Sequence, residues 1–529
     1  MFSSVISGAV CGIGSCLIQV ETDVANGLPC LSMVGYPGSE VREAGERVRV
    51  ALRNTGIHMP PMHVTINLSP ANIRKEGTAY DLPIAIGIMI SMGLIRQEAV
   101  RDILIIGELG LNGEIKSVPG VLPMITEAGK QGCKVCIVPK ENVGEAAVVG
   151  SMVSYGADTL LQIKDFLCAG AREQKNILEP TTVNLAEIIK DTQKPETPDC
   201  SLDDISGQEN VKRAAIVAAA GFHHLLLIGP PGSGKTMIAK RIPSILPPLS
   251  IEESLEISTI YSVSGKLGGD NILIRKRPFL NPHHTITEQA LVGGGRIPRP
   301  GIISLAHRGV LFLDELPEFR RDVIEILRQP LEDKEVHIAR TYGTYSYPAD
   351  FMLVAAMNPC PCGYFPDYEK CVCTPAEIKR YLNKISGPIL DRIDICTEAG
   401  RVPIENLDGE NFTNEKLNHH KETFGSKKLL QMVENARAMQ KERYAGTSYR
   451  FNGDLPSSEI RKYCTLHKEE RQFLEKVFHK MELSARAYHK ILRVARTLAD
   501  LEESHEIKVT HLAEAVSYRV NGGKYWRNQ

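Results

Sequence analysis

The chain has 529 residues, of which 43% are apolar and 24% charged, and its formal net charge at pH 7 is -1. This length and apolar content indicate several domains with substantial cores. Because the net charge is close to zero, the protein exerts no general attraction on nucleic acid, and any contact with DNA must be local. The longest apolar stretch, residues 82–95, contains Pro83 and is too short to cross a bilayer, so we expect no membrane partner.

The first predicted domain covers residues 1–170 and alternates strand and helix patterns. His63–Leu68 has the pattern of a strand, Asp81–Met92 that of a helix and Ile103–Gly107 that of a second strand. The N-terminal residues lack the basic region of a signal peptide, so the 13 cysteines are expected to be reduced. We therefore expect a cytoplasmic protein that begins with a separate α/β domain.

Three motifs of this domain, Ile66–Gly77, Gly107–Lys116 and Ile137–Asn142, resemble the catalytic fold of the Lon proteases. The catalytic dyad is missing. Ala79 stands where the resemblance places the nucleophilic serine, and Leu122 stands where it places the lysine. Since neither side chain can act as nucleophile or base, we expect a docking or ring-organising domain that is not a protease.

Proline-containing polar stretches at Glu179–Thr182 and Gln193–Asp199 indicate a linker, which we place at residues 171–200. The next predicted domain covers residues 201–402. Its central motif, Gly229–Thr236, fits G-x-x-x-x-G-K-[ST] without a mismatch and follows the apolar run Leu225–Ile228. This context predicts a phosphate-binding loop, and the alternative is a turn rich in glycine and proline.

Each part of such a loop has a chemical reason. Glycines let backbone N–H groups converge on phosphate oxygens, Lys235 adds its charge, and the Thr236 hydroxyl can take a coordination position on Mg²⁺. The residues predicted to bind ATP with Mg²⁺ are Gly229, Pro230, Pro231, Gly232, Ser233, Gly234, Lys235, Thr236 and Asp314.

Groups suited to hydrolysis follow the loop. The buried-strand pattern Val310–Glu315 ends in two carboxylates, Asp314, which we assign to magnesium, and Glu315, which we assign to the attacking water. The next strand pattern leads to Asn358, whose amide could orient that water. Arg392 stands where a neighbouring subunit's nucleotide could receive it as an arginine finger. Taken singly, each could be an ordinary strand end or a surface ion pair.

The stretch between Thr236 and Asp314 is longer than a strand–helix–strand repeat needs, and such segments are usually functional. It carries turn patterns and basic residues, and a hairpin pattern follows at Val336–Ser346. Cations suit phosphates and aromatic rings suit bases. The candidate DNA contacts are Lys266, Arg275, Lys276, Arg277, Arg340, Tyr342 and Tyr345. The alternative is a set of solvated loops with ordinary basic residues.

Four cysteines form two close pairs, Cys360 with Cys362 and Cys371 with Cys373. Two thiolate pairs that flank a turn can close a tetrahedral Zn²⁺ site, although C-x-C is tighter than the usual C-x₂-C spacing. Such a site would brace the loop between the nucleotide and Arg392, so we expect a structural metal. The alternative is a group of buried or reactive thiols.

The last part of the chain is predicted to be a connector at residues 403–425 and a helical lid at residues 426–529. Apolar residues recur at helical spacing in Leu429–Ala436, Phe473–Phe478 and Ile491–Leu498.

The ordered set of Lys235, Asp314, Asn358 and Arg392 resembles the AAA+ ATPases, in the branch of the magnesium chelatase ATPase subunit and the MCM-type helicases. The resemblance implies an αβα P-loop NTPase core with a helix-2 insert whose loops face the pore of a ring. It also makes Arg486 a sensor that contacts the nucleotide from the lid, where the alternative is a solvated helix residue.

The whole layout resembles the YifB/ComM family. This resemblance implies a bacterial, cytosolic, hexameric ring that uses ATP to move on DNA and promotes branch migration during recombination in natural transformation. Two alternatives remain: a metal-chelatase-type motor that acts on a partner subunit, and an ATP-gated scaffold that holds a protein partner. Stimulation of hydrolysis by DNA would separate the helicase from both.

Overall fold

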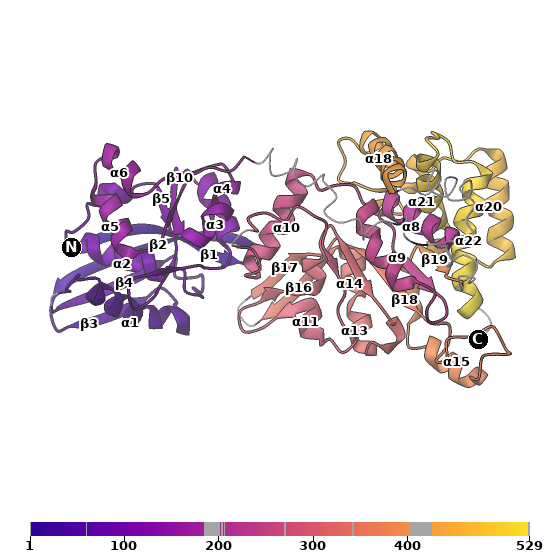
Figure 1. Cartoon of the computed structure of the whole chain (residues 1–529), viewed down its shortest axis with the longest axis horizontal. Helices are drawn as coiled ribbons and strands as arrows, with labels where there is room; N and C mark the ends of the chain where they lie inside the picture. The colour runs from indigo at the N-terminus through magenta and orange to yellow at the C-terminus, as the bar shows by residue number, and fades with distance from the viewer. Residues whose placement is uncertain are drawn as a thin grey trace, which may run out of the picture.

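The computed structural model describes residues 2–59, 61–184, 202, 205, 207–268, 271–340, 343–400 and 426–526. The molecule is elongated, with the N-terminal domain at one end, the ATPase domain in the middle and a group of helices at the other end (Figure 1). The predicted connector and linker residues 185–200 lie outside the described residues. Within the described residues, no helix is long and apolar enough to cross a membrane.

The N-terminal domain is built on an eight-stranded sheet with the order β10-β9-β8-β5-β1-β2-β4-β3. The β1–β2, β2–β4 and β9–β10 pairs are antiparallel and the other pairs are parallel. Its strands are β1 (Phe2–Cys11), β2 (Gly14–Asn26), β3 (Cys30–Val34), β4 (Met62–Ser69), β5 (Ile103–Ile105), β8 (Val135–Pro139), β9 (Val153–Ala157) and β10 (Pro180–Thr181). A small separate pair is β6 (Glu108–Leu109) with β7 (Ile115–Lys116).

The helices of this domain are α1 (Ser39–Asn54), α2 (Asp81–Ser91), α3 (Val121–Lys130), α4 (Val143–Val148), α5 (Leu160–Cys168) and α6 (Ala171–Ile177). Every residue of α2 is buried, because its sequence is apolar on all faces. Its one charged residue, Asp81, accepts two hydrogen bonds from the guanidinium of Arg47, at 2.7 and 2.9 Å. Pairing of this kind is what allows a carboxylate to be buried.

The folded N-terminal part extends further along the chain than the sequence analysis placed it. Residues 171–181, predicted as linker, form α6 and the edge strand β10, which pairs with β9. The polar stretch at Glu179–Thr182 therefore includes an edge strand, and short edge strands carry little of the apolar alternation that identifies a strand in a sequence.

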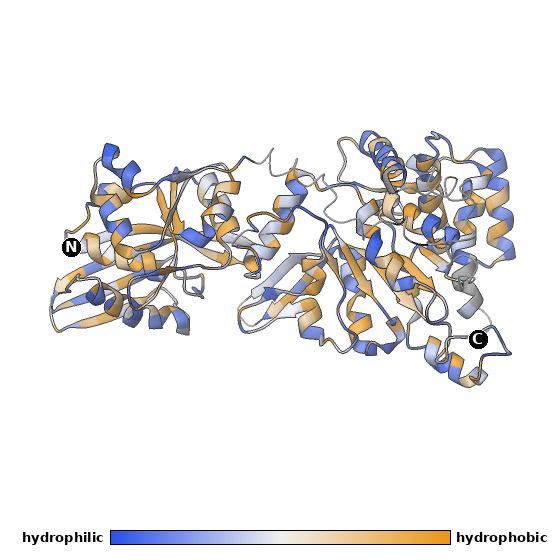
Figure 2. Ribbon diagram, in the orientation of Figure 1, coloured by the Kyte–Doolittle hydropathy of each residue, from blue (hydrophilic) through white to orange (hydrophobic). Residues whose placement is uncertain are grey.

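The ATPase domain contains a five-stranded parallel sheet with the order β12-β15-β18-β11-β19. Its strands are β11 (Leu225–Ile228), β12 (Phe279–Leu280), β15 (Val310–Leu313), β18 (Met352–Met357) and β19 (Ile395–Glu398). The strands are buried on both faces and appear as a block of hydrophobic ribbon in Figure 2. Alternate residues face two different cores: Phe312 packs with the lid side, and Leu311 and Leu313 pack with the opposite side.

Helices and two hairpins surround this sheet. The helices are α8 (Glu209–Gly221), α9 (Lys235–Arg241), α10 (Ile251–Val263), α11 (Glu288–Val292), α12 (Ile302–Leu305), α13 (Arg321–Ile326), α14 (Arg328–Asp333), α15 (Pro375–Leu382) and α16 (Gly387–Leu390). The hairpins are β13 (Gly293–Gly294) with β14 (Arg299–Pro300), and β16 (Glu335–Arg340) with β17 (Gly343–Pro348). Much of the long stretch between Thr236 and Asp314 is thus regular structure.

The C-terminal helices are α18 (Ser426–Arg443), α19 (Ile460–Tyr463), α20 (Lys468–Lys480), α21 (Ala485–Leu501) and α22 (Val509–Trp526). They share one hydrophobic core with α8 and one face of the ATPase sheet. Phe222, at the end of α8, stacks on Phe451 of the lid with ring centroids 4.6 Å apart. The lid is therefore packed against the ATPase domain through a continuous apolar core.

The N-terminal and ATPase domains meet where α3 lies beside α10 (Figure 1). Ser262 of α10 donates a hydrogen bond to the buried carboxylate of Glu145, and its backbone carbonyl accepts one from Gly120 at 3.0 Å. Glu145 also accepts a hydrogen bond from the backbone N–H of Leu122 at 2.9 Å. The contact is thus made of satisfied buried polar groups, which specify one arrangement of the two domains.

Candidate nucleotide-binding site

The predicted phosphate loop joins β11 to α9 at the carboxyl edge of the parallel sheet. A Cβ atom on Gly229 would lie 2.2 Å from the carbonyl oxygen of Ala399, so no larger residue fits where the loop leaves β11. Gly234 has φ of 81°, a left-handed conformation that glycine adopts without strain, and α9 begins at the next residue. The glycines of the motif are therefore required by backbone geometry at these two positions.

The ammonium group of Lys235 lies against this loop. It donates hydrogen bonds to the carbonyls of Gly229 at 2.7 Å and Pro230 at 2.9 Å, and to the side-chain oxygen of Asn358 at 3.2 Å. Burial lowers the pKa of Lys235, and the nearby charges of Asp314 and Glu315 oppose that shift. Because a poorly hydrated cation gains more from an anion than a hydrated one, Lys235 is well prepared for a phosphate group.

Thr236 and Asp314 are also brought together. The Thr236 hydroxyl donates a hydrogen bond of 2.7 Å to a carboxylate oxygen of Asp314. Two neighbouring oxygen ligands of octahedral Mg²⁺, each about 2.1 Å from the ion, are about 2.9 Å apart. This pair of oxygens therefore fits two adjacent ligand positions of a magnesium ion, which Thr236 and Asp314 would hold.

Glu315 follows directly and is exposed. Its φ is 52°, and its backbone N–H donates a hydrogen bond of 3.0 Å to the carboxylate of Asp314. A left-handed conformation is strained for a residue with a side chain, and such strain concentrates at functional sites. Two successive carboxylates with different environments, one half-buried beside Thr236 and one exposed, suit the two roles assigned to them.

The two predicted arginines lie apart from this cluster. Arg392 forms an ion pair of 2.5 Å with Glu332 and donates hydrogen bonds to the carbonyls of Arg328 and Pro388. Arg486 is exposed in the first turn of α21. The described contacts of Arg392 include no residue of the phosphate loop, as an arginine that serves a neighbouring subunit requires.

Sequence reasoning missed one residue of the site, Gln208. Its side-chain amide donates hydrogen bonds to the carbonyls of Ser233, at 3.1 Å, and of Gly400. Its φ is 59°, so it turns the chain into α8 in a strained conformation. Gln208 thereby ties the start of the domain to the phosphate loop. The sequence around Gln208 carries no pattern that indicates this long-range contact.

The four predicted metal ligands do converge. The sulfur atoms of Cys360, Cys362, Cys371 and Cys373 all lie within 4.8 Å of one another. Cys360 Sγ is 3.3 Å from Cys362 Sγ and 3.8 Å from Cys371 Sγ. Four sulfurs at 2.3 Å around zinc would be about 3.8 Å apart, so the cluster fits a tetrahedral Zn²⁺ site after small adjustments.

This cysteine cluster touches the phosphate loop. A Cβ atom on Gly363 would lie 2.4 Å from Cδ of Pro231, and Gly363 has φ of 83°. The backbone N–H of Gly363 donates a hydrogen bond to Cys360 Sγ at 3.2 Å. A metal held by these cysteines would therefore fix the loop that packs against the nucleotide site.

Five of the predicted DNA contacts are at least partly exposed to solvent. Lys266, Lys276 and Arg340 are exposed, and Arg275 and Tyr345 are partly exposed. Tyr342 lies outside the described residues.

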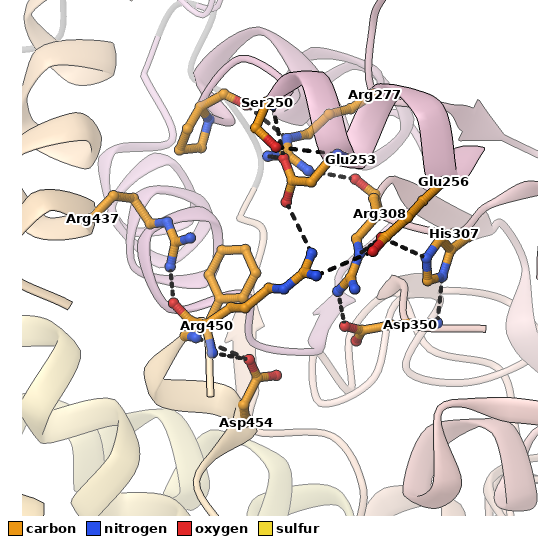
Figure 3. Close-up of polar contacts among 12 residues, drawn as sticks. Ser250, Glu253, Glu256, Arg277, His307, Arg308, Asp350, Arg437, Arg450 and Asp454 are labelled. Carbon is orange, nitrogen blue, oxygen red and sulfur yellow. Dashed lines mark hydrogen bonds and ion pairs between the residues drawn. The ribbon is translucent and has the colours of Figure 1, made fainter. Parts of the chain in front are cut away.

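The prediction for Arg277 was wrong. Its guanidinium is buried, forms an ion pair of 3.0 Å with Glu253, and donates hydrogen bonds of 2.7 Å to the carbonyls of Pro247 and Arg308 (Figure 3). Nothing in the basic stretch Arg275–Arg277 indicates which of its three side chains is buried inside the protein. Because its guanidinium is buried and its charge is paired with Glu253, Arg277 is not available to a phosphate at the surface.

Arg277 belongs to a buried ion cluster that the sequence did not predict, and we call it the α10 ion cluster. Its members are Glu253, Glu256, Arg277, His307, Arg308, Asp350 and Arg450 (Figure 3). Arg450 comes from the lid and lies 3.2 Å from Glu256 and 3.7 Å from Glu253. The cluster therefore connects α10, which touches the N-terminal domain, with the lid.

The structure describes the two positions at which the resemblance to the Lon proteases places a serine and a lysine. Ala79 lines a cavity beside the ATPase hairpins, and Leu122 is buried in α3. Neither offers a nucleophile or a base, so these positions cannot perform peptide hydrolysis by a serine–lysine dyad.

Comparisons with known proteins agree with this geometry. Three family models match: "Magnesium chelatase, subunit ChlI" at residues 201–407, "Subunit ChlI of Mg-chelatase" at residues 20–142, and "Magnesium chelatase, subunit ChlI C-terminal" at residues 424–519. A magnesium-chelatase 38 kDa subunit of Cereibacter sphaeroides is 25% identical over 171 residues, which cover 29% of this chain and 51% of that protein.

Two relatives match almost the whole chain. The uncharacterized protein YifB of Salmonella typhimurium is 41% identical over 514 residues, covering 97% of this chain and 96% of the relative. The competence protein ComM of Haemophilus influenzae is 41% identical over 519 residues, covering 98% of this chain and 97% of the relative. With this identity over nearly its full length, and with a phosphate loop, acidic strand end and cysteine cluster in place, the chain belongs to the YifB/ComM family of magnesium-chelatase-like AAA+ proteins.

Proposed function

We propose that the protein is an ATP-hydrolysing motor that acts on DNA as a hexameric ring and promotes branch migration in recombination. One observation carries the ATPase: Lys235, Thr236, Asp314 and Asn358 meet within hydrogen-bond distance at one sheet edge. The relationship to a competence protein supports the choice of DNA as the substrate of the motor.

Each side chain has a task in this proposal. Lys235 and the loop N–H groups hold the phosphates, and Thr236 with Asp314 would hold Mg²⁺, which neutralises charge on the phosphate oxygens. Glu315 accepts the proton of the attacking water, and Asn358 orients that water. Arg392 serves the site of the next subunit, and Arg486 serves the nucleotide from the lid.

The surface loops supply the contact with DNA. Lys266, Arg275 and Arg340 bind phosphates, and Tyr345, together with Tyr342, stacks on bases. Arg277 is not part of this surface, because its charge is satisfied inside the protein. The cysteine cluster holds a structural Zn²⁺ that fixes the loop against Pro231.

A second candidate is a motor that drives a protein partner, either as a metal-chelatase-type subunit or as an ATP-gated scaffold. The match to the magnesium-chelatase 38 kDa subunit favours it, but that match covers only 29% of this chain. Two observations argue against this candidate. The N-terminal domain adds a large folded unit to the ATPase, and the full-length relatives include a competence protein.

The test is ATP hydrolysis by the purified protein with and without single-stranded and forked DNA. The Glu315→Gln variant serves as the control for contaminating ATPases, and its rate should fall by about 10²–10⁴-fold, as expected for loss of a general base. We expect several-fold stimulation by DNA. Hydrolysis that is insensitive to DNA would reject the helicase and favour the motor on a protein partner.

A further inference from the structure

A cavity of about 510 Å³ lies where the N-terminal domain meets the two hairpins of the ATPase domain. The N-terminal domain lines it with the end of β1, with Tyr36 and with residues 72–74 and 76–80. The ATPase domain lines it with residues 296–299 of the first hairpin, and with Arg340 and Tyr345 of the second. We call it the junction cavity. None of the residues assigned to ATP lines it.

The two hairpins form one fixed wall of this cavity. The Tyr347 hydroxyl, in the second hairpin, donates a hydrogen bond of 2.7 Å to the carbonyl of Pro298 in the first. Arg340 donates a weaker one, 3.4 Å long, to the carbonyl of Gly295. Because the hairpins are tied in this way, Arg340 is held beside the first hairpin and its two arginines, Arg296 and Arg299.

The charges of the cavity do not cancel. Its two carboxylates are engaged: Glu40 accepts a hydrogen bond from the backbone N–H of Gly77 at 3.0 Å, and Glu76 forms an ion pair of 2.9 Å with Arg74. Within the part of the chain that the structure describes, no carboxylate forms an ion pair with Arg296, Arg299 or Arg340. The lining carries four arginines, Arg74, Arg296, Arg299 and Arg340, against two carboxylates, so the cavity favours a ligand with negative charge.

An aromatic residue of the N-terminal domain, Tyr36, also lines the cavity. Tyr36 is 45% exposed and has φ of 61°, which is a strained conformation for a residue with a side chain. The strain is maintained by Lys75, whose backbone N–H donates to the Tyr36 carbonyl at 3.2 Å and whose ammonium donates to the Gly35 carbonyl at 2.9 Å. The fold thus holds an exposed ring in a fixed place, with Tyr345 as a second ring in the same cavity.

From these observations we propose that the junction cavity binds single-stranded nucleic acid. Arg296, Arg299 and Arg340 take the phosphates, and Tyr36 and Tyr345 stack on bases. Phosphates spaced along a chain together with flat rings match both features of the wall. An acidic peptide would match the charges but would leave both rings without a flat partner. The inference rests on the proposed function, and it adds the N-terminal domain as one side of the DNA path.

The test measures binding of a fluorescein-labelled oligothymidine to the full-length protein by anisotropy, at several salt concentrations. Tyr36→Asn removes the ring with a residue that tolerates the left-handed backbone, and Tyr36→Phe keeps the ring. We expect Tyr36→Asn to weaken binding by about five-fold or more and Tyr36→Phe to bind as wild type does. The matched control is Arg49→Ala, which removes an exposed arginine of α1 and should leave binding unchanged.

The double variant Arg296→Ala/Arg299→Ala tests the phosphate contacts. Each phosphate contact to a single strand contributes about 0.7 to the slope of log affinity against log salt, so this slope should fall by about 1.4. Unchanged affinity and slope in both the Tyr36→Asn and the double variant would overturn the inference, even if DNA stimulates hydrolysis. Displacement of the oligonucleotide by polyglutamate as readily as by unlabelled oligothymidine would overturn it in favour of an acidic peptide.

The proposed function fails separately. If DNA does not stimulate hydrolysis by the wild-type protein, the motor on DNA is rejected whatever the variants bind. Loss of binding in Tyr36→Asn with retention in Tyr36→Phe would still support the cavity as a nucleic-acid site.

Discussion

The nucleotide-binding edge and the α10 ion cluster are both rich in charge, but their charges have different partners. At the nucleotide edge, Glu315 is exposed, and the buried ammonium of Lys235 is held by backbone carbonyls and an amide oxygen, which are neutral groups. In the ion cluster, Arg277 and Arg308 are buried and paired with carboxylates. The comparison teaches that a cation's position in a basic stretch does not reveal whether it serves a ligand or the fold.

The largest expected effect is on the rate of ATP hydrolysis and concerns Arg392, which we propose to act on the nucleotide of a neighbouring subunit. Arg392→Ala should lower the rate of hydrolysis by about 10³-fold or more while the affinity for ATP changes little, because an arginine finger acts on the transition state. Steady-state hydrolysis and binding of a fluorescent ATP analogue measure the two quantities. Glu332→Gln is the control, since it removes the ion-pair partner and leaves the arginine. Normal hydrolysis by Arg392→Ala would exclude the assignment.

Substitutions in the α10 ion cluster should lower the stability of the folded protein. Arg277→Ala leaves the buried carboxylate of Glu253 with only its longer contact to Arg450, and we expect the free energy of unfolding to fall by about 3–5 kcal/mol. Urea unfolding, followed by circular dichroism, measures this loss. Arg275→Ala, two residues earlier and partly exposed, should change it by less than about 0.5 kcal/mol. If the Arg277→Ala variant were stable and bound DNA more weakly than the wild type, Arg277 would be a DNA contact and not an internal ion pair.

The cysteine cluster sharpens the comparison, because it touches the phosphate loop but is expected to act on stability. Metal analysis should find about one zinc ion per chain, and Cys371→Ser should lose it and lower the melting temperature by several degrees. Cys168→Ser, which changes an exposed cysteine outside the cluster, should keep both. Purified protein without zinc and with an unchanged melting temperature in Cys371→Ser would contradict a structural metal.

The smallest effect concerns pH. Burial lowers the pKa of His224 to about 4, although the nearby carboxylate of Asp394 opposes the shift, and Nδ1 of His224 accepts a hydrogen bond of 3.1 Å from the backbone N–H of Leu353. The folded state therefore holds this histidine neutral, whereas the unfolded chain protonates it near pH 6.5.

The direction in which stability changes with pH follows from this difference in pKa between the folded and unfolded states. Above pH 6.5 neither state binds the proton and the stability is fully present, and between pH 6.5 and about 4 the unfolded state takes up more protons and stability falls. The slope from this group is at most about 1.4 kcal/mol per pH unit. His224→Asn, whose side-chain oxygen can accept the same hydrogen bond, should reduce the pH dependence of urea unfolding in this window. An unchanged pH dependence would show that His224 does not titrate there.

The nucleotide edge was predictable because its information is local. The apolar run Leu225–Ile228 forms β11, and the predicted strand Val310–Glu315 forms β15 over its four apolar residues, with the two carboxylates just after it. Parallel strands bring their carboxyl ends to one edge, so Lys235, Asp314 and Asn358 had to meet once these strands were neighbours. The cysteine cluster was predictable for the same reason, since its four ligands span only residues 360–373.

Other features depend on contacts between distant residues. The edge strand β10 was assigned to the linker because its pairing with β9 leaves no pattern in its own two residues. Gln208 reaches the phosphate loop and Gly400 across long separations in the chain, and its role has no local signature.

The sequence by itself determined the chemistry of the ATPase site, since glycine, lysine, threonine and paired acids at motif spacing leave few other uses for those groups. Only the tertiary structure decided that Arg277 is internal, that Arg450 of the lid joins α10, and that Tyr36 lines the same cavity as the arginine-bearing hairpins. The physical reason is that a motif depends on residues that lie close together in the chain. Burial and charge pairing depend instead on surfaces assembled from distant parts of the chain.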